Sequence, residues 1–166
     1  CCCFDRENPL SPEDNAAAIE EAIRFELNQP EGDLAAEDLA KIESLDLSEK
    51  WVVYDLSPLA QLPALDFLNL NSNSITDLSP ITQLRNLEVL GLTKNHIQDL
   101  TPLSGLPKLR ELYIQQNQIT DPSPLGQLTN LKKLDLSANP IPKEALEKLR
   151  QALPDCEIHF IPAILP

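Results

Sequence analysis

The chain has 166 residues, which suits about one domain, and its formal net charge is −13. This acidity argues against binding to nucleic acid, whose phosphates require clustered Lys and Arg, and against direct electrostatic attraction to anionic lipid. The sequence contains no run of 18 apolar residues, so no transmembrane helix is predicted.

The chain begins with three adjacent cysteines, and it contains no methionine. A chain beginning with Cys is typical of a mature bacterial lipoprotein, whose first Cys carries lipid after the signal peptide is removed. We therefore expect lipidation of Cys1 and a tether over residues 1–13; the alternative is a chain boundary that happens to fall here. The cysteines lack the separated spacing of metal ligands, so no metal site is predicted.

Residues 14–44 are predicted to form a helical cap on the segment that follows. The stretch Asn15–Asn28 places apolar residues at helical spacing, and Pro30 and Gly32 end this pattern. A second, shorter helix is predicted over residues 34–44. Together the two helices would cover the exposed core and sheet edge at the start of a repeat array.

A 22-residue period dominates residues 45–160. Leu68 recurs as Leu90, Leu112 and Leu134, and Asn73 recurs as Asn95, Asn117 and Asn139. The pattern L-x-x-L-x-L-x-x-N-x-I at this period is that of a leucine-rich repeat. It predicts an α/β fold: a right-handed solenoid of about five repeats plus a closing strand, with a parallel concave sheet, a helical N-terminal cap and a C-terminal helix-strand cap. Residues 161–166 are expected to form a tail.

Two polar residues recur with the same period. The Asn after each strand can satisfy backbone groups in a buried turn, because its amide both donates and accepts hydrogen bonds. The Asp of the unit D-L-S/T-P recurs as Asp55, Asp77, Asp99 and Asp121. We interpret these aspartates as parts of a capped turn on the convex side. The alternative is a row of metal ligands, which is disfavoured because a repeat unit rarely encodes a site.

The first and last repeats depart from the regular pattern. The first has one extra residue between Leu47 and Val53, so that either Lys50 or Trp51 stands at the Asn position. We interpret this as an irregular capping coil; the alternative is that Trp51 is a ligand platform. In the last repeat a helix is predicted from Pro142 to Leu153. A closing strand over residues 156–160 follows, with Cys156 as a buried hydrophobe.

The repeat motif closely resembles the 22-residue repeats of the bacterial internalin family. The resemblance extends to the helical stretch before the first repeat and to the ending NPIPKEALEKLRQALPDCEIHF. It implies a protein at the bacterial surface that binds host or other proteins through its concave sheet. Eukaryotic regulators of protein phosphatases share a related repeat, which leaves a cytoplasmic regulatory or scaffolding subunit as the alternative.

Most residues predicted to point outward from the concave sheet are polar, but Phe67, Val89 and Tyr113 are exceptions on three consecutive coils. Strands about 4.8 Å apart would gather them into one patch of the kind that forms interface hot spots. The alternative is that they are isolated exposed apolar residues. The residues expected to bind a protein partner are Phe67, Asn69, Val89, Glu111, Tyr113, Lys133 and Asp135. We expect a monomer located extracellularly or at the cell surface.

A catalytic role is the alternative to binding. The simple 22-residue alignment places Asp135 beside Glu157, with His159 one step along the strand, and such a set is suited to acid–base work. An open, shallow sheet does not exclude water, and the sequence lacks a phosphate-binding glycine loop, a nucleophile elbow and an HExxH motif. We therefore expect no enzymatic activity, no catalytic residues, no cofactor and no metal.

Overall fold

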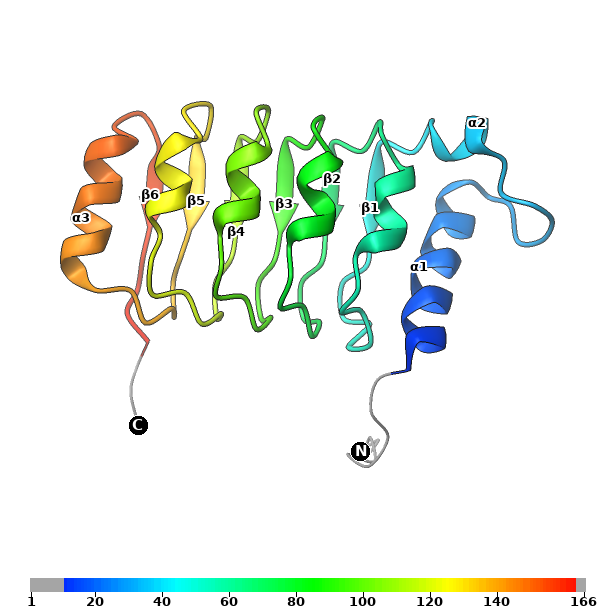
Figure 1. Cartoon of the computed structure of the whole chain (residues 1–166), viewed down its shortest axis with the longest axis horizontal. Coiled ribbons are helices and arrows are strands. Elements are labelled where there is room, and N and C mark those ends of the chain that lie inside the picture. Colours follow the sequence, from blue (N-terminus) through cyan, green and yellow to red (C-terminus); the bar gives the residue numbers. More distant parts are fainter. Residues whose placement is uncertain (1–10, 164–166) are drawn as a thin grey trace.

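The computed structural model describes residues 11–163, which form a solenoid around one parallel sheet (Figure 1). The sheet has six strands in the order β1-β2-β3-β4-β5-β6, so every strand lies beside its neighbour in sequence. The strands are β1 (Ser44–Asp46), β2 (Phe67–Asn69), β3 (Val89–Gly91), β4 (Glu111–Tyr113), β5 (Lys133–Asp135) and β6 (Glu157–His159). The predicted right-handed leucine-rich repeat fold is confirmed.

Short 3-10 helices form the opposite, convex side of each regular coil. They are η1 (Ser57–Gln61), η2 (Ser79–Gln83), η3 (Thr101–Gly105) and η4 (Ser123–Gln127), and each has Pro in its first turn. The recurring Asp stands two residues before the Ser or Thr that opens each helix. Its carboxylate accepts that residue's backbone N–H at 2.8–2.9 Å. The prediction that these aspartates cap a convex turn is therefore confirmed. Within residues 11–163, no cluster of candidate metal ligands occurs.

Leucine and isoleucine side chains from all coils fill the space between the sheet and the convex helices. Leu45, Leu68, Leu90, Leu112 and Leu134 align across the strands and are fully buried. The core continues without a break from Ile19 in the N-terminal helix to Leu153 in the C-terminal helix. One coil cannot bury its own apolar ring, so each coil is stabilised by its neighbours.

The recurring asparagines form a buried ladder. The Asn95 amide donates to the carbonyls of Leu70 and Leu92 at 3.0 and 3.1 Å, and its Oδ1 accepts the N–H of Ile75 at 3.0 Å. Asn117 and Asn139 repeat this arrangement one and two coils further on. Each Asn therefore joins the coil before it to its own coil.

The N-terminal cap consists of one long and one very short helix. Helix α1 (Pro12–Glu26) begins after Ser11, whose hydroxyl accepts the N–H of Asp14, and lies beside β1 at the end of the solenoid (Figure 1). The predicted helix over residues 34–44 is wrong in length, because α2 is only Ala36–Leu39. The chain straightens before Ser44 to form β1, where the Glu43 carbonyl accepts from the N–H groups of Asp66 and Phe67.

The first coil contains a one-residue insertion, and the insertion is Trp51. Strand pairing offsets Leu45 from Leu68 by one residue more than the regular repeat. Glu49 takes the left-handed position that Ser72, Lys94, Gln116 and Ala138 take in later coils, so Lys50 stands at the ladder position. Trp51 adds a second left-handed residue, with φ 62°. This backbone conformation costs a residue with a bulky side chain about 1–2 kcal/mol.

The C-terminal cap is a helix and a strand, as predicted, but the strand register differs from the prediction. Helix α3 (Lys143–Ala152) replaces the 3-10 turn and lies at the other end of the solenoid from α1 (Figure 1). The longer crossover brings Ile158, not Cys156, opposite Leu134. Cys156 is half-buried rather than fully buried, and this burial raises the pKa of its thiol.

Candidate protein-binding surface

The concave face is defined by the outward residues of the six strands. One column contains Ser44, Phe67, Val89, Glu111, Lys133 and Glu157, and the next contains Asp46, Asn69, Gly91, Tyr113, Asp135 and His159. The seven residues proposed to bind a partner therefore all lie on β2 to β5, in two adjacent columns. The register places Phe67 beside Val89, and Tyr113 between Gly91 and Asp135.

Apolar surface on this face is concentrated on β2 to β4. Phe67 is 37 % exposed, whereas Val89 and Tyr113 are half-buried. Gly91, which pairs with Tyr113 across the strands, has no free space above it: a Cβ there would lie only 3.1 Å from the Oδ1 atoms of Asn69 and Asn71. These two amides lean over the glycine, so a larger residue at position 91 would displace them.

A polar network joins β4 to β5. The Tyr113 hydroxyl donates to the Glu111 carboxylate at 2.6 Å, and the Lys133 ammonium lies 5.3 Å from the centre of the Tyr113 ring. The ammonium is therefore placed for a cation–π interaction. Contact with the Tyr113 phenol raises the pKa of Lys133, so this side chain is charged at neutral pH. The tyrosine ring is held in one orientation, which lowers the entropy cost of using it as a binding anchor.

The β1 end of the concave face carries an ordered acid. Burial raises the pKa of Asp46, but hydrogen bonds from Ser48 and Asn69 outweigh it, so the pKa lies below its ordinary value. The Asn69 amide donates to the Asp46 carboxylate at 3.3 Å, and the Ser48 N–H donates to it at 2.8 Å. Asp46 is therefore a fixed negative charge beside Asn69.

The register at the other end breaks up the acid–base set considered from the sequence. Asp135 lies opposite His159, and Glu157 lies opposite Lys133, so the expected Asp135–Glu157 pair does not form across the strands. The cause is the two-residue offset introduced by α3.

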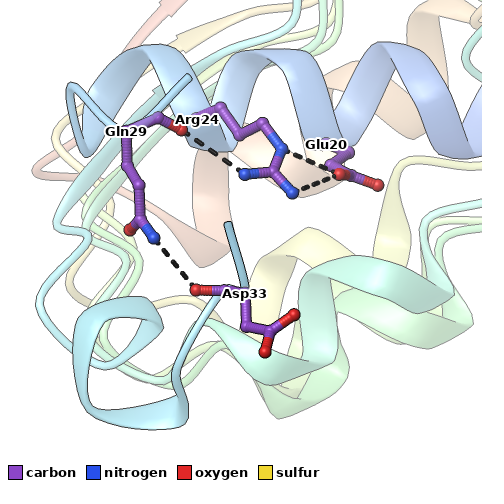
Figure 2. Close-up of polar contacts among 4 residues, drawn as sticks. All are labelled: Glu20, Arg24, Gln29 and Asp33. Carbon is purple, nitrogen blue, oxygen red and sulfur yellow. Dashed lines mark hydrogen bonds and ion pairs between the residues drawn. The ribbon is translucent and has the colours of Figure 1, made fainter. Parts of the chain in front are cut away.

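A groove on α1 was not foreseen from the sequence. Its volume is about 720 Å³, and Ala17, Glu21, Phe25 and Pro30 are among the residues that line it. Figure 2 shows how its wall is held: Arg24 pairs with Glu20 at 2.7 Å and donates to the Gln29 carbonyl, while the Gln29 amide donates to the Asp33 carbonyl at 2.9 Å. Phe25 is 83 % exposed. The periodicity of the sequence does not indicate this groove, because Phe25 lies outside the inward stripe that includes Ile19 and Ile23.

Two expectations about the membrane concern different parts of the chain. Cys1, the proposed lipidation site, lies outside the described residues. Within residues 11–163, no helix has both the length and the apolar character required to span a bilayer.

Comparison with known proteins identifies the repeats. The family model described as "Leucine Rich repeats (2 copies)" matches residues 63–105, 85–125 and 107–151. No curated protein matches the chain. Among solved structures, an internalin of Listeria monocytogenes is 28% identical, with a TM-score of 0.72, and the match covers 88% of this chain and 42% of that one. The chain therefore spans less than half the length of that internalin.

Two further structures support the same fold. A leucine-rich repeat protein of Leptospira interrogans is 36% identical, with a TM-score of 0.66, over 77% of this chain and 34% of that one. An internalin C2 of Listeria monocytogenes has a TM-score of 0.61 over 87% of this chain and 92% of that one. At 22% identity, the second likeness supports the fold alone.

Proposed function

Because the chain belongs to the leucine-rich repeat family and is internalin-like, we propose that it binds another protein through its concave face. The fold supports a protein–protein interaction module. The observation that carries the proposal is the grouping of Phe67, Val89 and Tyr113 on β2, β3 and β4, within a face that is otherwise polar.

The arrangement of this surface matches the anatomy of an interface. Tyr113 is held by Glu111 and Lys133, and it presents a rigid aromatic ring of the type enriched at hot spots. Phe67 supplies exposed apolar area, and Asn69 supplies an amide beside it. Glu111, Lys133 and Asp135 provide charges of both signs, which favour a partner with a mixed-charge surface over nucleic acid, whose phosphates repel a chain with net charge −13.

Crosslinking tests the proposed face directly. A photoreactive amino acid at the exposed concave position 133 should capture a specific protein from extracts of cells that meet this protein, and one at the exposed convex position 83 should not. Equal capture at both positions would contradict the concave site. With the captured partner purified, Tyr113→Ala and Phe67→Ala should each weaken binding by roughly 30-fold, the loss typical of hot-spot truncation. Gln83→Ala on the convex side is the matched control.

We further propose that the protein acts outside the cytoplasm, at the bacterial surface, as a monomer. The support is its likeness to internalin structures, whose family acts at or beyond the cell surface. The proposed attachment is lipid on Cys1. Cell fractionation with Cys1→Ser in the full precursor tests the location: wild type should be found with membranes and the variant should be released. Recovery of wild type in the cytoplasm would instead favour a regulatory or scaffolding subunit.

A further inference from the structure

A second hollow lies along the edge of the solenoid where the coils turn after their strands. Its volume is about 430 Å³, and it is lined by Trp51, Ser74, Lys94, His96, Gln116 and Gln118, together with three ladder asparagines. Ser74, His96 and Gln118 recur at the 22-residue period, so they form a row that crosses neighbouring coils about 4.8 Å apart. Trp51 stands at the start of this row. This hollow is not part of the concave face described above.

Hydrogen bonds order this row. The Ser74 hydroxyl donates to the Trp51 carbonyl at 3.2 Å, which ties the inserted residue to the next coil. Further along, the Gln98 amide donates to Gln118 Oε1 at 2.8 Å, and Gln118 Nε2 lies 3.5 Å from His96 Nδ1. Ser74 and Gln118 are therefore each hydrogen-bonded to the preceding coil, while their surroundings stay open to solvent.

Trp51 reaches this position through an insertion that disturbs the repeat. It is the residue that lengthens the first coil, it adopts a left-handed backbone, and it is 55 % exposed. The ladder is incomplete at the same place: within residues 11–163, the Asn73 Oδ1 atom is buried without a hydrogen-bond partner. In later coils the equivalent oxygen accepts a backbone N–H. Residues held in unfavourable backbone conformations cluster at functional sites, so Trp51 is a candidate for a functional role.

The charge of this hollow, which we call the Trp51 groove, indicates what kind of ligand it accepts. The whole chain has a net charge of −13. Among the described residues that line the groove, none carries a carboxylate, and Lys94 is the one permanent charge. The other polar groups are amides, a hydroxyl and an imidazole. Such groups both donate and accept hydrogen bonds, which suits a ligand rich in hydroxyl groups.

From this combination we propose that the Trp51 groove binds a neutral oligosaccharide. The flat face of the indole carries negative π-electron density, which attracts the weakly positive C–H groups on the face of a pyranose ring. The side chains of Ser74, His96, Gln116 and Gln118 would meet the hydroxyl groups of the following sugar units along the row. Sugar binding would account for the inserted Trp51, whose side chain is neither buried in the core nor part of the asparagine ladder.

The single tryptophan provides a direct readout. Its fluorescence is titrated with neutral glucan, mannan, xylan and chitin oligosaccharides, using the full chain. At least one class should change the emission in a saturable manner. His96→Ala and Gln118→Ala retain the reporter and should each weaken that binding at least threefold. Trp51→Ala removes the reporter, so calorimetry is used for this variant, and binding should weaken at least tenfold. Phe67→Ala on the concave face should bind sugar as wild type does.

Several results would overturn the proposal. One is that no oligosaccharide of the panel changes the emission or gives heat on mixing. Another is that binding survives Trp51→Ala, or that Phe67→Ala weakens it as strongly, which would move the sugar to the concave face. If the emission responds only to the protein captured by the concave face, the groove belongs to that protein interface instead. Trp51→Phe distinguishes loss of stacking from loss of fold, because it keeps an aromatic face and should retain part of the affinity.

Discussion

The ladder asparagines are chemically identical but not equivalent in their bonds. Asn95 uses both ends of its amide, whereas Asn73 donates to the Leu47 carbonyl at 2.8 Å but leaves its Oδ1 unpaired in the described structure. Removing a buried polar side chain costs about 1–3 kcal/mol when its buried hydrogen-bond partners are left unsatisfied. Asn95→Ala should therefore cost that much, and Asn73→Ala should cost less, because no backbone N–H loses an acceptor. Urea unfolding measures both; equal losses would contradict the difference in bonding.

The capping aspartates make stability depend on pH. Hydrogen bonds from Ser57 and Ser79 hold the pKa values of Asp55 and Asp77 below the ordinary 3.8. A carboxyl group with a lowered folded-state pKa stabilises the fold above its unfolded pKa, and this contribution disappears as pH falls through the folded value. Near neutral pH these groups should therefore cause no change in the free energy of unfolding. Below about pH 4 that free energy should fall as the two carboxylates are protonated.

A matched variant isolates this effect. Asp55→Asn with Asp77→Asn keeps an oxygen that accepts the hydrogen bonds but cannot titrate. Its stability should fall less steeply than that of wild type between pH 4 and pH 2. Parallel pH profiles for the two proteins would show that other carboxylates cause the acid sensitivity.

At this scale the sequence predicts residues in the regular repeats well and those at irregular places poorly. Leu68, Leu90 and Asn95 are placed correctly because the period fixes both their register and their direction. The alternatives at the first coil could not be separated from the sequence, because either Lys50 or Trp51 satisfies the alignment. Only the backbone shows that Glu49 takes the regular left-handed position and that Trp51 is the additional residue.

At the scale of elements, α1 packs its apolar face into the core and is also hydrogen-bonded to the first coil through the buried Asn15 side chain. Asn15 Oδ1 accepts the N–H groups of Tyr54 and Asp55 at 2.9 Å, and its amide donates to the Asp55 carbonyl at 3.0 Å. Asn15→Ala should destabilise the protein by about 1–3 kcal/mol. Amide hydrogen exchange should accelerate most in α1 and the first coil, because the cap loosens locally. Uniform acceleration along the chain would contradict a local role, and Gln83→Ala at an exposed convex position is the control.

The errors of prediction at this scale have physical causes. A period of 22 extrapolates correctly only while the crossover keeps its length, and α3 adds two residues, which changes the neighbour of Asp135 from Glu157 to His159. The helix expected over residues 34–44 contains residues with good helix propensity, but backbone pairing with β2 overrides it at Ser44. Phe25 follows neither the repeat nor the cap stripe, so the groove on α1 carried no periodic signal.

The whole molecule is a chain of coils that contact only their neighbours, closed by helices at both ends. Leu90 lies at its centre, fully buried between β2 and β4. Leu90→Ala should cost about 2–5 kcal/mol, because the core of a thin solenoid has little room to collapse around a cavity. Because one core runs through all coils, we expect this loss to lower the stability of every coil. Trp51 reports on the first coil, whereas far-ultraviolet circular dichroism reports on all coils.

If the solenoid unfolds as one unit, both signals should shift to lower urea by the same amount in Leu90→Ala. If the coils unfold in turn, the Trp51 transition should separate from the circular dichroism transition, since the first coil and α1 would retain their own contacts. The exposed convex variant Gln83→Ala controls for changes unrelated to the core. A loss below 1 kcal/mol in Leu90→Ala would contradict the strand register, because Leu90 would then not occupy a packed position between two strands.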